Sequence, residues 1–243
     1  MIHGPEGAPA RPWLSDFERH DYRLIWRGKG LEDAAEKHII LSWLPPGGRC
    51  LELGAGFGRI TQILKPRFNE VVSLDLSGRN LGIAKQRVAG VEWGRSDVAS
   101  IPFRDSAFDC IVMVRVVHLL PDPVAVMKEA CRVAREGGSV IISVPNLAMN
   151  SLLWRISRDP RMFGPAEWPF GERPYLDVSR GIIPEGFRLL KKRGTGLFDN
   201  PVGRLCQGMK RLYLLDVATS FLWIFKLDVF LKNEVRKSAL DLL

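Results

Sequence analysis

Apolar and polar positions alternate along residues 31–146 with two periods, one typical of helices and one typical of strands. Residues 31–44 place apolar side chains at helical spacing with charged side chains on the other face, and Pro45, Pro46 and Gly47 then end that helix. Beyond it, strands are expected at 49–55, 70–76, 91–97, 108–116 and 139–146, and helices at 58–68, 78–89 and 123–134. This alternation predicts a doubly wound α/β fold with a mostly parallel sheet and helices on both faces.

Later segments complete the predicted organisation. Glu136-Gly137-Gly138 is expected to end the last of these helices. Residues 147–185 are rich in Trp, Pro, Arg and Gly and have no clear periodicity. Because an irregular stretch of this length is more often functional than accidental, it is a candidate substrate lid. Two final strands are expected at 187–198 and 226–235, separated by an amphipathic helix around 205–224. The predicted parts are an N-terminal cap (1–30), a core (31–146), the insert (147–185) and a C-terminal part of the same domain (186–243).

Composition fits one globular domain that needs neither a metal nor a disulfide. The chain has 243 residues, of which 46% are apolar and 26% are charged, and a chain of this size can bury a sufficient hydrophobic core. Its four cysteines are scattered, with no CxxC pair and no histidine at metal-ligand spacing, so we interpret them as reduced thiols. We expect a cytoplasmic protein, because residues 1–23 hold no stretch of signal-peptide type and charges interrupt the apolar segment 212–231.

The net charge of +8 is concentrated in the last third of the chain. Residues 1–150 hold 19 Lys and Arg against 17 Asp and Glu, whereas residues 151–243 hold 16 against 10. A basic solvated surface is the simplest explanation, because the chain has no long run of like charges. Basic residues near the apolar segment also leave open a peripheral membrane contact. The oligomeric state stays open.

A glycine-rich turn follows the first predicted strand. Gly54, Ala55, Gly56 and Gly58 form a GxGxG pattern before a predicted helix, and Glu52 stands two positions before the first glycine. Glycine lets a backbone approach a ligand closely. The dinucleotide fingerprint is instead GxGxxG, and the Glu52 carboxylate would repel a diphosphate. The loop therefore suits a nucleoside with a cationic end and disfavours a nicotinamide-dependent oxidoreductase.

Two more acids end the next two predicted strands. Asp75 lies 23 residues after Glu52, where a carboxylate can accept hydrogen bonds from both ribose hydroxyls, with a helix N-cap or turn role as the alternative. Asp97 can accept a hydrogen bond from an exocyclic amine, with Val98 covering the base ring. Because ligands of open α/β sheets bind at the carboxyl ends of the strands, these residues are expected to converge on one crevice.

Four segments in register carry a family resemblance. They are CLELGAGFGRIT, VVSLDLS, SDVASIPFRDSAFDCIVMVRVVHLLPDP and EACRVAREGGSVIISVPN. Together they resemble the class I S-adenosylmethionine-dependent methyltransferases, in particular the small-molecule branch with the ubiquinone/menaquinone-type enzymes. The resemblance implies a Rossmann-like, mostly parallel seven-stranded sheet whose last strand is antiparallel. It also implies S-adenosylmethionine as the cofactor, S-adenosylhomocysteine as the product, and methyl transfer to a small-molecule acceptor, with hydrophobic acceptors as candidates.

The resemblance further implies which residues hold the cofactor. The glycine loop would lie against the methionine part, Asp75 would bind the ribose, and Asp97 would approach the adenine amine with Val98 beside the ring. The end of the fourth strand would lie near the transferable methyl. The predicted cofactor-binding residues are Glu52, Gly54, Ala55, Gly56, Gly58, Asp75, Leu76, Asp97, Val98, Val114 and Arg115.

The acceptor side offers candidate residues. His118, just past the fourth strand, is either a general base for a hydroxyl acceptor or a loop histidine bonded to backbone. Tyr22 and Arg27 precede the first long helix, where N-terminal segments of the family close the cofactor pocket, and a core position is the alternative for Tyr22. Glu167 and Tyr175 lie in the irregular insert and are candidate substrate contacts.

Two other functions stay open at the level of sequence. A nucleic-acid methyltransferase or binding protein would use the basic C-terminal third and the seven tryptophans. Against it, the fourth strand ends in MVRVVHLL and lacks the Asn/Asp-Pro-Pro-aromatic motif of enzymes that methylate base amino groups. A catalytically silent cofactor-binding protein would carry the same loop and acids. We expect no metal, and no nucleic acid as the main partner.

Overall fold

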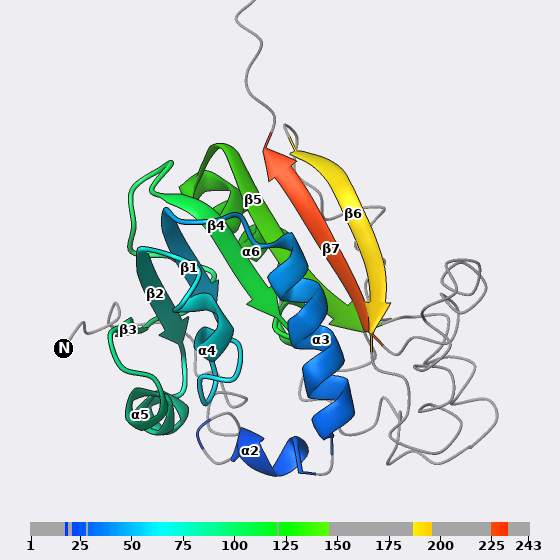
Figure 1. Cartoon of the computed structure of the whole chain (residues 1–243). Helices are drawn as coiled ribbons and strands as arrows, with labels where there is room; N and C mark the ends of the chain where they lie inside the picture. The colour runs from blue at the N-terminus through cyan, green and yellow to red at the C-terminus, as the bar shows by residue number, and fades with distance from the viewer. Residues whose placement is uncertain are drawn as a thin grey trace, which may run out of the picture.

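The computed structural model describes residues 18, 21–27, 29–120, 122–145, 187–195 and 225–232. Among them, the helices are α2 (Tyr22–Ile25), α3 (Gly30–Trp43), α4 (Thr61–Leu64), α5 (Gly78–Arg87) and α6 (Pro123–Val133), with a 3-10 helix η1 (Val117–Leu119). The strands are β1 (Arg49–Leu53), β2 (Glu70–Asp75), β3 (Glu92–Arg95), β4 (Phe108–Val114), β5 (Ala134–Pro145), β6 (Phe187–Thr195) and β7 (Phe225–Lys232) (Figure 1). The predicted lid at 147–185 and helix at 205–224 lie outside the described residues.

The described strands form one sheet in the order β3-β2-β1-β4-β5-β7-β6. Neighbouring strands from β3 to β5 pair in parallel. Strand β7 lies between β5 and β6 and runs antiparallel to both. Parallel neighbours need crossover connections, which the intervening helical segments supply. The mostly parallel, Rossmann-like sheet predicted from the sequence is confirmed.

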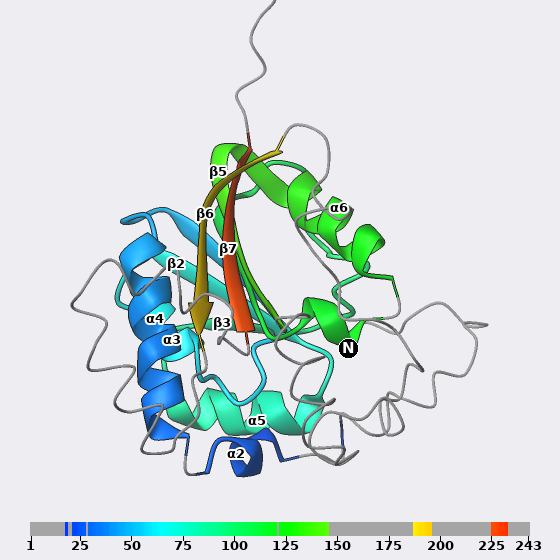
Figure 2. The ribbon, with the colours of Figure 1, turned by 90° about the vertical axis from the view of Figure 1, so that its right-hand side faces the viewer.

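Helices cover the sheet from two sides, and the strands alternate accordingly. In β1, Cys50 packs with residues of α3 in one apolar cluster, whereas its neighbour Leu51 packs with residues of α6 in another. Figure 2 shows α3 and α6 on opposite sides of the sheet. Strands buried on both faces are expected to be largely apolar, and in the RCLEL and FDCIVMV runs only Arg49, Glu52 and Asp109 are charged. The core therefore consists of two layers that share the central strands.

The helix predicted at 58–68 is shorter, Thr61–Leu64, and the predicted boundary between the last helix and the next strand is wrong. Helix α6 ends at Val133, and β5 begins directly at Ala134, so Glu136-Gly137-Gly138 lies inside the strand instead of ending the helix. The pairing of β5 with β4 shifts register between Phe108 and Cys110. A Cβ on Gly138 would come within 2.8 Å of the Arg135 carbonyl oxygen, so this irregular strand start requires glycine.

The parallel order brings the ends of β1, β2 and β4 to one edge of the sheet. The amides of Gly54 and Ala55 donate to the Leu74 carbonyl at 2.8 and 3.0 Å, which ties the turn after β1 to the end of β2. Gly54 has φ +76°, and a Cβ there would overlap the side chain of Val116, just beyond β4. The glycine therefore permits both the turn and the close approach of the β4 end.

Candidate functional site

A cavity of about 520 Å³ opens at the carboxyl ends of the parallel strands. Ten of the eleven predicted cofactor-binding residues line it. Gly58 does not line it and faces α5 instead, where a Cβ would lie 3.3 Å from the Cβ of Ala84. The convergence predicted for the glycine loop and the three acids is therefore present in the structure.

Asp75 is fixed by backbone amides at the end of β2. The amide of Gly56 donates to its Oδ2 at 2.7 Å, and the amide of Ser77 donates to its Oδ1 at 2.8 Å. Burial raises the pKa of Asp75 above its ordinary value. The N-cap of α5 is Ser77, whose Oγ accepts from the Asn80 amide, so the N-cap alternative for Asp75 is wrong. The turn alternative is confirmed, because Asp75 accepts from the amide of Ser77 two residues later. A carboxylate has about four lone-pair sites, so two amides still leave acceptor capacity for ligand hydroxyls.

Glu52 is a buried carboxyl group, with its side chain between β1, α4 and β2. The hydroxyls of Thr61 and Ser73 donate to its Oε2 at 2.6 and 2.8 Å. Burial, which outweighs these two hydrogen bonds, raises the pKa of Glu52 to about 7. The charge of this cavity residue therefore depends on pH near neutrality, and a cationic ligand would favour its ionised form.

Asp97 and Val98 lie in the turn after β3, which ends at Arg95, slightly earlier than predicted. The Ala99 amide donates to Asp97 Oδ1 at 2.9 Å and closes a local turn. Val98 is buried, and it lines the cavity together with Leu76 from the turn after β2. This end of the cavity therefore combines a carboxylate with an apolar surface.

Cationic and aromatic side chains also line the cavity. Arg115, directly after β4, lies 4.5 Å from the Trp26 ring centroid, and Arg59 lies 3.8 Å from the same centroid. Tyr22 and Trp26 both line the cavity, so the N-terminal segment contributes to its wall as predicted. Arg27 is exposed and does not line it.

The remaining predicted residues are only partly placed. His118 lies in η1, four residues beyond the end of β4, but its side chain is outside the described part. Glu167 and Tyr175 lie outside the described residues. Within the described residues, no group of three or more His, Cys, Asp and Glu side chains could hold a metal ion. None of the described helices is long and apolar enough to cross a membrane.

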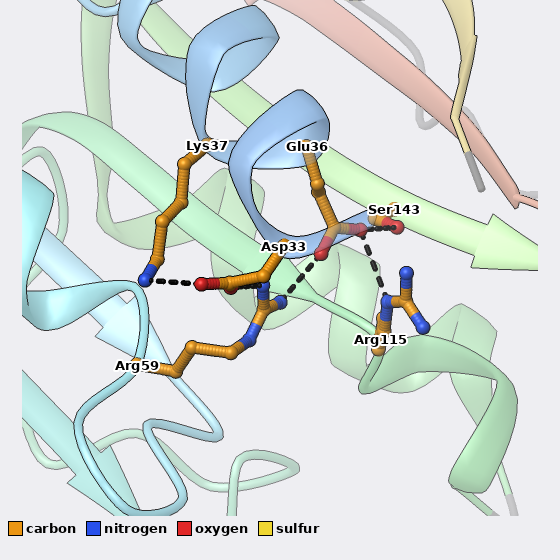
Figure 3. A network of polar contacts seen from close by, with 6 residues as sticks. All are labelled: Asp33, Glu36, Lys37, Arg59, Arg115 and Ser143. Carbon is orange, nitrogen blue, oxygen red and sulfur yellow. Dashed lines mark hydrogen bonds and ion pairs between the residues drawn. The ribbon is translucent and has the colours of Figure 1, made fainter. Parts of the chain in front are cut away.

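Sequence reasoning missed Glu36 and Arg59. The pattern of α3 placed its charges on a solvent face, yet Glu36 is fully buried. It is buried because its carboxylate pairs with Arg59 and Arg115 from distant parts of the chain (Figure 3). Arg59 directly follows the last glycine of the loop, and this position next to the loop could have indicated that it belongs to the site.

Fold and site together define a Rossmann-like domain with a cavity at its strand ends. Residues 51–142 match the family model of the methyltransferase domain. The chain is 32% identical over 120 residues to malonyl-[acyl-carrier protein] O-methyltransferase of Serratia marcescens, an alignment that covers 49% of this chain and 46% of that protein. It is 26% identical over 194 residues to the ubiquinone/menaquinone biosynthesis C-methyltransferase UbiE of a Ruegeria species, with 73% and 78% covered.

Solved structures agree on the fold. The N-methyltransferase NodS of Bradyrhizobium japonicum, in complex with S-adenosyl-L-homocysteine, superposes with a TM-score of 0.61 at 17% identity, over 92% of this chain and 98% of that one. The chain spans about half the length of the first curated relatives it matches. Residues 51–142 therefore carry the match to a methyltransferase domain, within a Rossmann-like fold.

Proposed function

We propose that this chain transfers the methyl group of S-adenosylmethionine to a small-molecule acceptor. The observation that carries the proposal is one cavity that joins the glycine loop, three carboxylates at strand ends and an apolar wall. Its volume of about 520 Å³ lies within the range of small-molecule sites, roughly 300–1,000 Å³. The match of residues 51–142 to the methyltransferase family supports the same function.

The cavity residues fit the parts of this cofactor. The bare backbone of Gly54 and Gly56 admits the methionine part closely. Asp75 is held by two amides and would accept from the ribose hydroxyls. Asp97 and Val98 would hold the adenine amine and ring. Glu52 supplies a carboxylate that complements a cationic ligand.

When bound, the cofactor supplies a methyl group on a positively charged sulfur, which is an activated leaving group. The residues of the chain must then hold the acceptor close to that methyl and in line with it. Orientation of this kind can lower a barrier by roughly 7–11 kcal/mol. Val114 and Arg115, at the carboxyl end of β4, are proposed to border the methyl position.

Apolar side chains next to β4 favour a hydrophobic acceptor. Val116, Leu119, Leu120 and Val126 line this part of the cavity. Burial of an acceptor's apolar surface against them contributes about 25 cal/mol per Å². A relative named fatty-acid O-methyltransferase, from Mycolicibacterium smegmatis, and the UbiE relative support an acceptor of this class.

The test is a methyl-transfer screen with tritium-labelled S-adenosylmethionine. The acceptor panel contains fatty acids, quinols, phospholipids, aliphatic amines and total RNA. We expect label in a small apolar product, with activity lost in Asp75→Ala and kept in Asp105→Ala, which changes an exposed carboxylate paired with Arg132. Label only in RNA, or no transfer to any acceptor, would contradict the proposal.

A further inference from the structure

A second cavity lies at the amino ends of the parallel strands, across the sheet from the cavity described above. Its volume is about 410 Å³, and it shares no lining residue with the first cavity. The loop from α3 to β1, the start of β4 and the early parts of β5 and β6 surround it, and this end of the sheet is at the top of Figure 1. The proposed function uses none of its residues.

Contacts around Asp109 fix the shape of the second cavity. The amide of Arg49 donates to Asp109 Oδ2 at 2.7 Å, and Nη1 of Arg135 donates to Oδ1 at 2.7 Å. Gly48 has φ +76°, and a Cβ there would come within 2.6 Å of Asp109 Oδ2, so the loop after α3 packs directly against this carboxylate. The wall is therefore already formed without a ligand, as small-molecule sites usually are.

One buried polar atom in the second cavity lacks a partner. Ser139 on β5 lines the cavity, and its Oγ is buried with no hydrogen bond within the described residues. Val140 packs in the apolar cluster of α6 and Ile141 in that of α3, so Ser139 faces the α3 side, as Ile141 does. Because buried hydroxyls are nearly always hydrogen-bonded, this one indicates a position for the polar group of a ligand.

The rest of the lining combines apolar surface with negative charge. Trp43, the last residue of α3, and Leu190 on β6, which is 43% exposed, are two of the apolar members. The charged lining residues are Asp109 and Glu136, and both are acids. Asp109 pairs with Arg135, whereas Glu136 is exposed and forms no ion pair within the part of the chain that the structure describes. This lining favours a cation with an apolar body over an anion.

We infer that the second cavity binds a small organic ammonium ion. The apolar body of this ligand packs against Trp43 and Leu190. Its nitrogen carries several N–H donors, which suit the Ser139 oxygen and the Glu136 carboxylate. The indole adds attraction, because tryptophan is the aromatic residue that attracts cations most strongly. The inference does not depend on the proposed function, since the two cavities have no residue in common.

The test is ligand-observed NMR titration at neutral pH with three molecules that share a phenyl ring and differ in charge. They are phenethylamine, which is a cation, phenethyl alcohol, which is neutral, and hydrocinnamate, which is an anion. The full chain is used.

Four variants of the chain are compared with the wild type. Glu136→Gln removes the unpaired charge, and Ser139→Ala removes the hydroxyl. Glu92→Gln is the matched control, because Glu92 is an exposed carboxylate on β3 that lines neither cavity. Asp75→Ala reports whether a molecule binds in the first cavity instead.

Wild type should bind phenethylamine about two- to fivefold more tightly than phenethyl alcohol, as expected for one exposed ion pair, and hydrocinnamate most weakly. Glu136→Gln should remove most of the difference between amine and alcohol. Ser139→Ala should weaken both about two- to tenfold, because one hydrogen bond is lost. Glu92→Gln and Asp75→Ala should keep the wild-type affinity for the amine.

The inference is overturned if the alcohol binds as tightly as the amine, or if wild type, Glu136→Gln and Ser139→Ala bind the amine equally. Loss of amine binding in Asp75→Ala would assign the amine to the first cavity and overturns it as well. Binding of none of the three molecules would leave the Ser139 hydroxyl with solvent alone and has the same consequence. Should Ser139→Ala fail to fold, Glu136→Gln decides, because its side chain is at the surface.

Discussion

Glu52 is expected to make the ligand affinity of the site depend on pH, and a single-residue variant can test this. With a pKa of about 7, roughly one tenth of the Glu52 side chains are ionised at pH 6 and nine tenths at pH 8. A cationic ligand favours the ionised form, so affinity for S-adenosylmethionine should rise up to about tenfold between these pH values. Titration calorimetry at both values is the measurement.

Glu52→Gln should remove most of that rise, because an amide does not titrate. Glu70→Gln is the matched control and should keep the wild-type rise. An equal rise in wild type and Glu52→Gln would show that another group, on the protein or on the ligand, controls the pH dependence.

His118 is the proposed general base if the acceptor is a hydroxyl, because it follows β4 within η1, beside Leu119 of the cavity. His118→Ala should then lower turnover by roughly 10²- to 10⁴-fold, the usual contribution of a positioned base. Affinity for S-adenosylhomocysteine should stay unchanged, because the base acts on the acceptor. Steady-state kinetics together with calorimetry test this, and full activity would return His118 to a structural role.

At the scale of elements, the effect of replacing glycine by alanine on stability can be compared at two positions, one in the turn after β1 and one inside a helix. Gly54 combines φ +76° with a Cβ position blocked by Val116, whereas Gly82 on α5 is exposed and has open space around its Cβ position. Gly54→Ala should destabilise the fold and abolish binding of S-adenosylhomocysteine. Gly82→Ala should stabilise it by about 0.5–1 kcal/mol through helix propensity. Urea unfolding measures both, and a neutral Gly54→Ala would contradict the close approach described here.

The start of α5 depends on its cap. Ser77 Oγ accepts from the Asn80 amide at 3.2 Å, so Ser77→Ala should cost about 1 kcal/mol in the free energy of unfolding. Ser42 is the matched control, because its hydroxyl only donates to the Ile39 carbonyl near the end of α3. Ser42→Ala should change stability by a few tenths of a kcal/mol at most. Equal losses in the two variants would show that the cap has no special role.

Local patterns predicted most elements, and the errors have a common cause. The helix at 31–44 and the strands that end at Leu53 and Asp75 follow from apolar periodicity within single segments. The early start of β5 at Ala134 instead depends on its irregular pairing with β4, a contact between distant segments. Glycine at 137 and 138 therefore marked an irregular strand and not a helix end.

At the scale of the whole molecule, some residues of the site could be predicted from the sequence and others could not. Glu52, Asp75 and Asp97 were predictable because parallel strands bring their carboxyl ends to one edge whatever the intervening residues are. The burial of Glu36 could not be predicted, because its partners Arg59 and Arg115 lie 23 and 79 positions away in sequence. A charged position in an amphipathic helix gives no local sign that ion pairs will bury it.

The central claim is that the carboxylates at the strand ends hold S-adenosylmethionine, and one titration tests it most directly. S-adenosylhomocysteine is titrated into wild type, Asp75→Ala and the surface control Asp105→Ala. The account predicts one bound molecule per chain, and an affinity that falls by 1–3 kcal/mol, about 5- to 150-fold, in Asp75→Ala alone. No binding to wild type, or equal affinity in all three proteins, would contradict it.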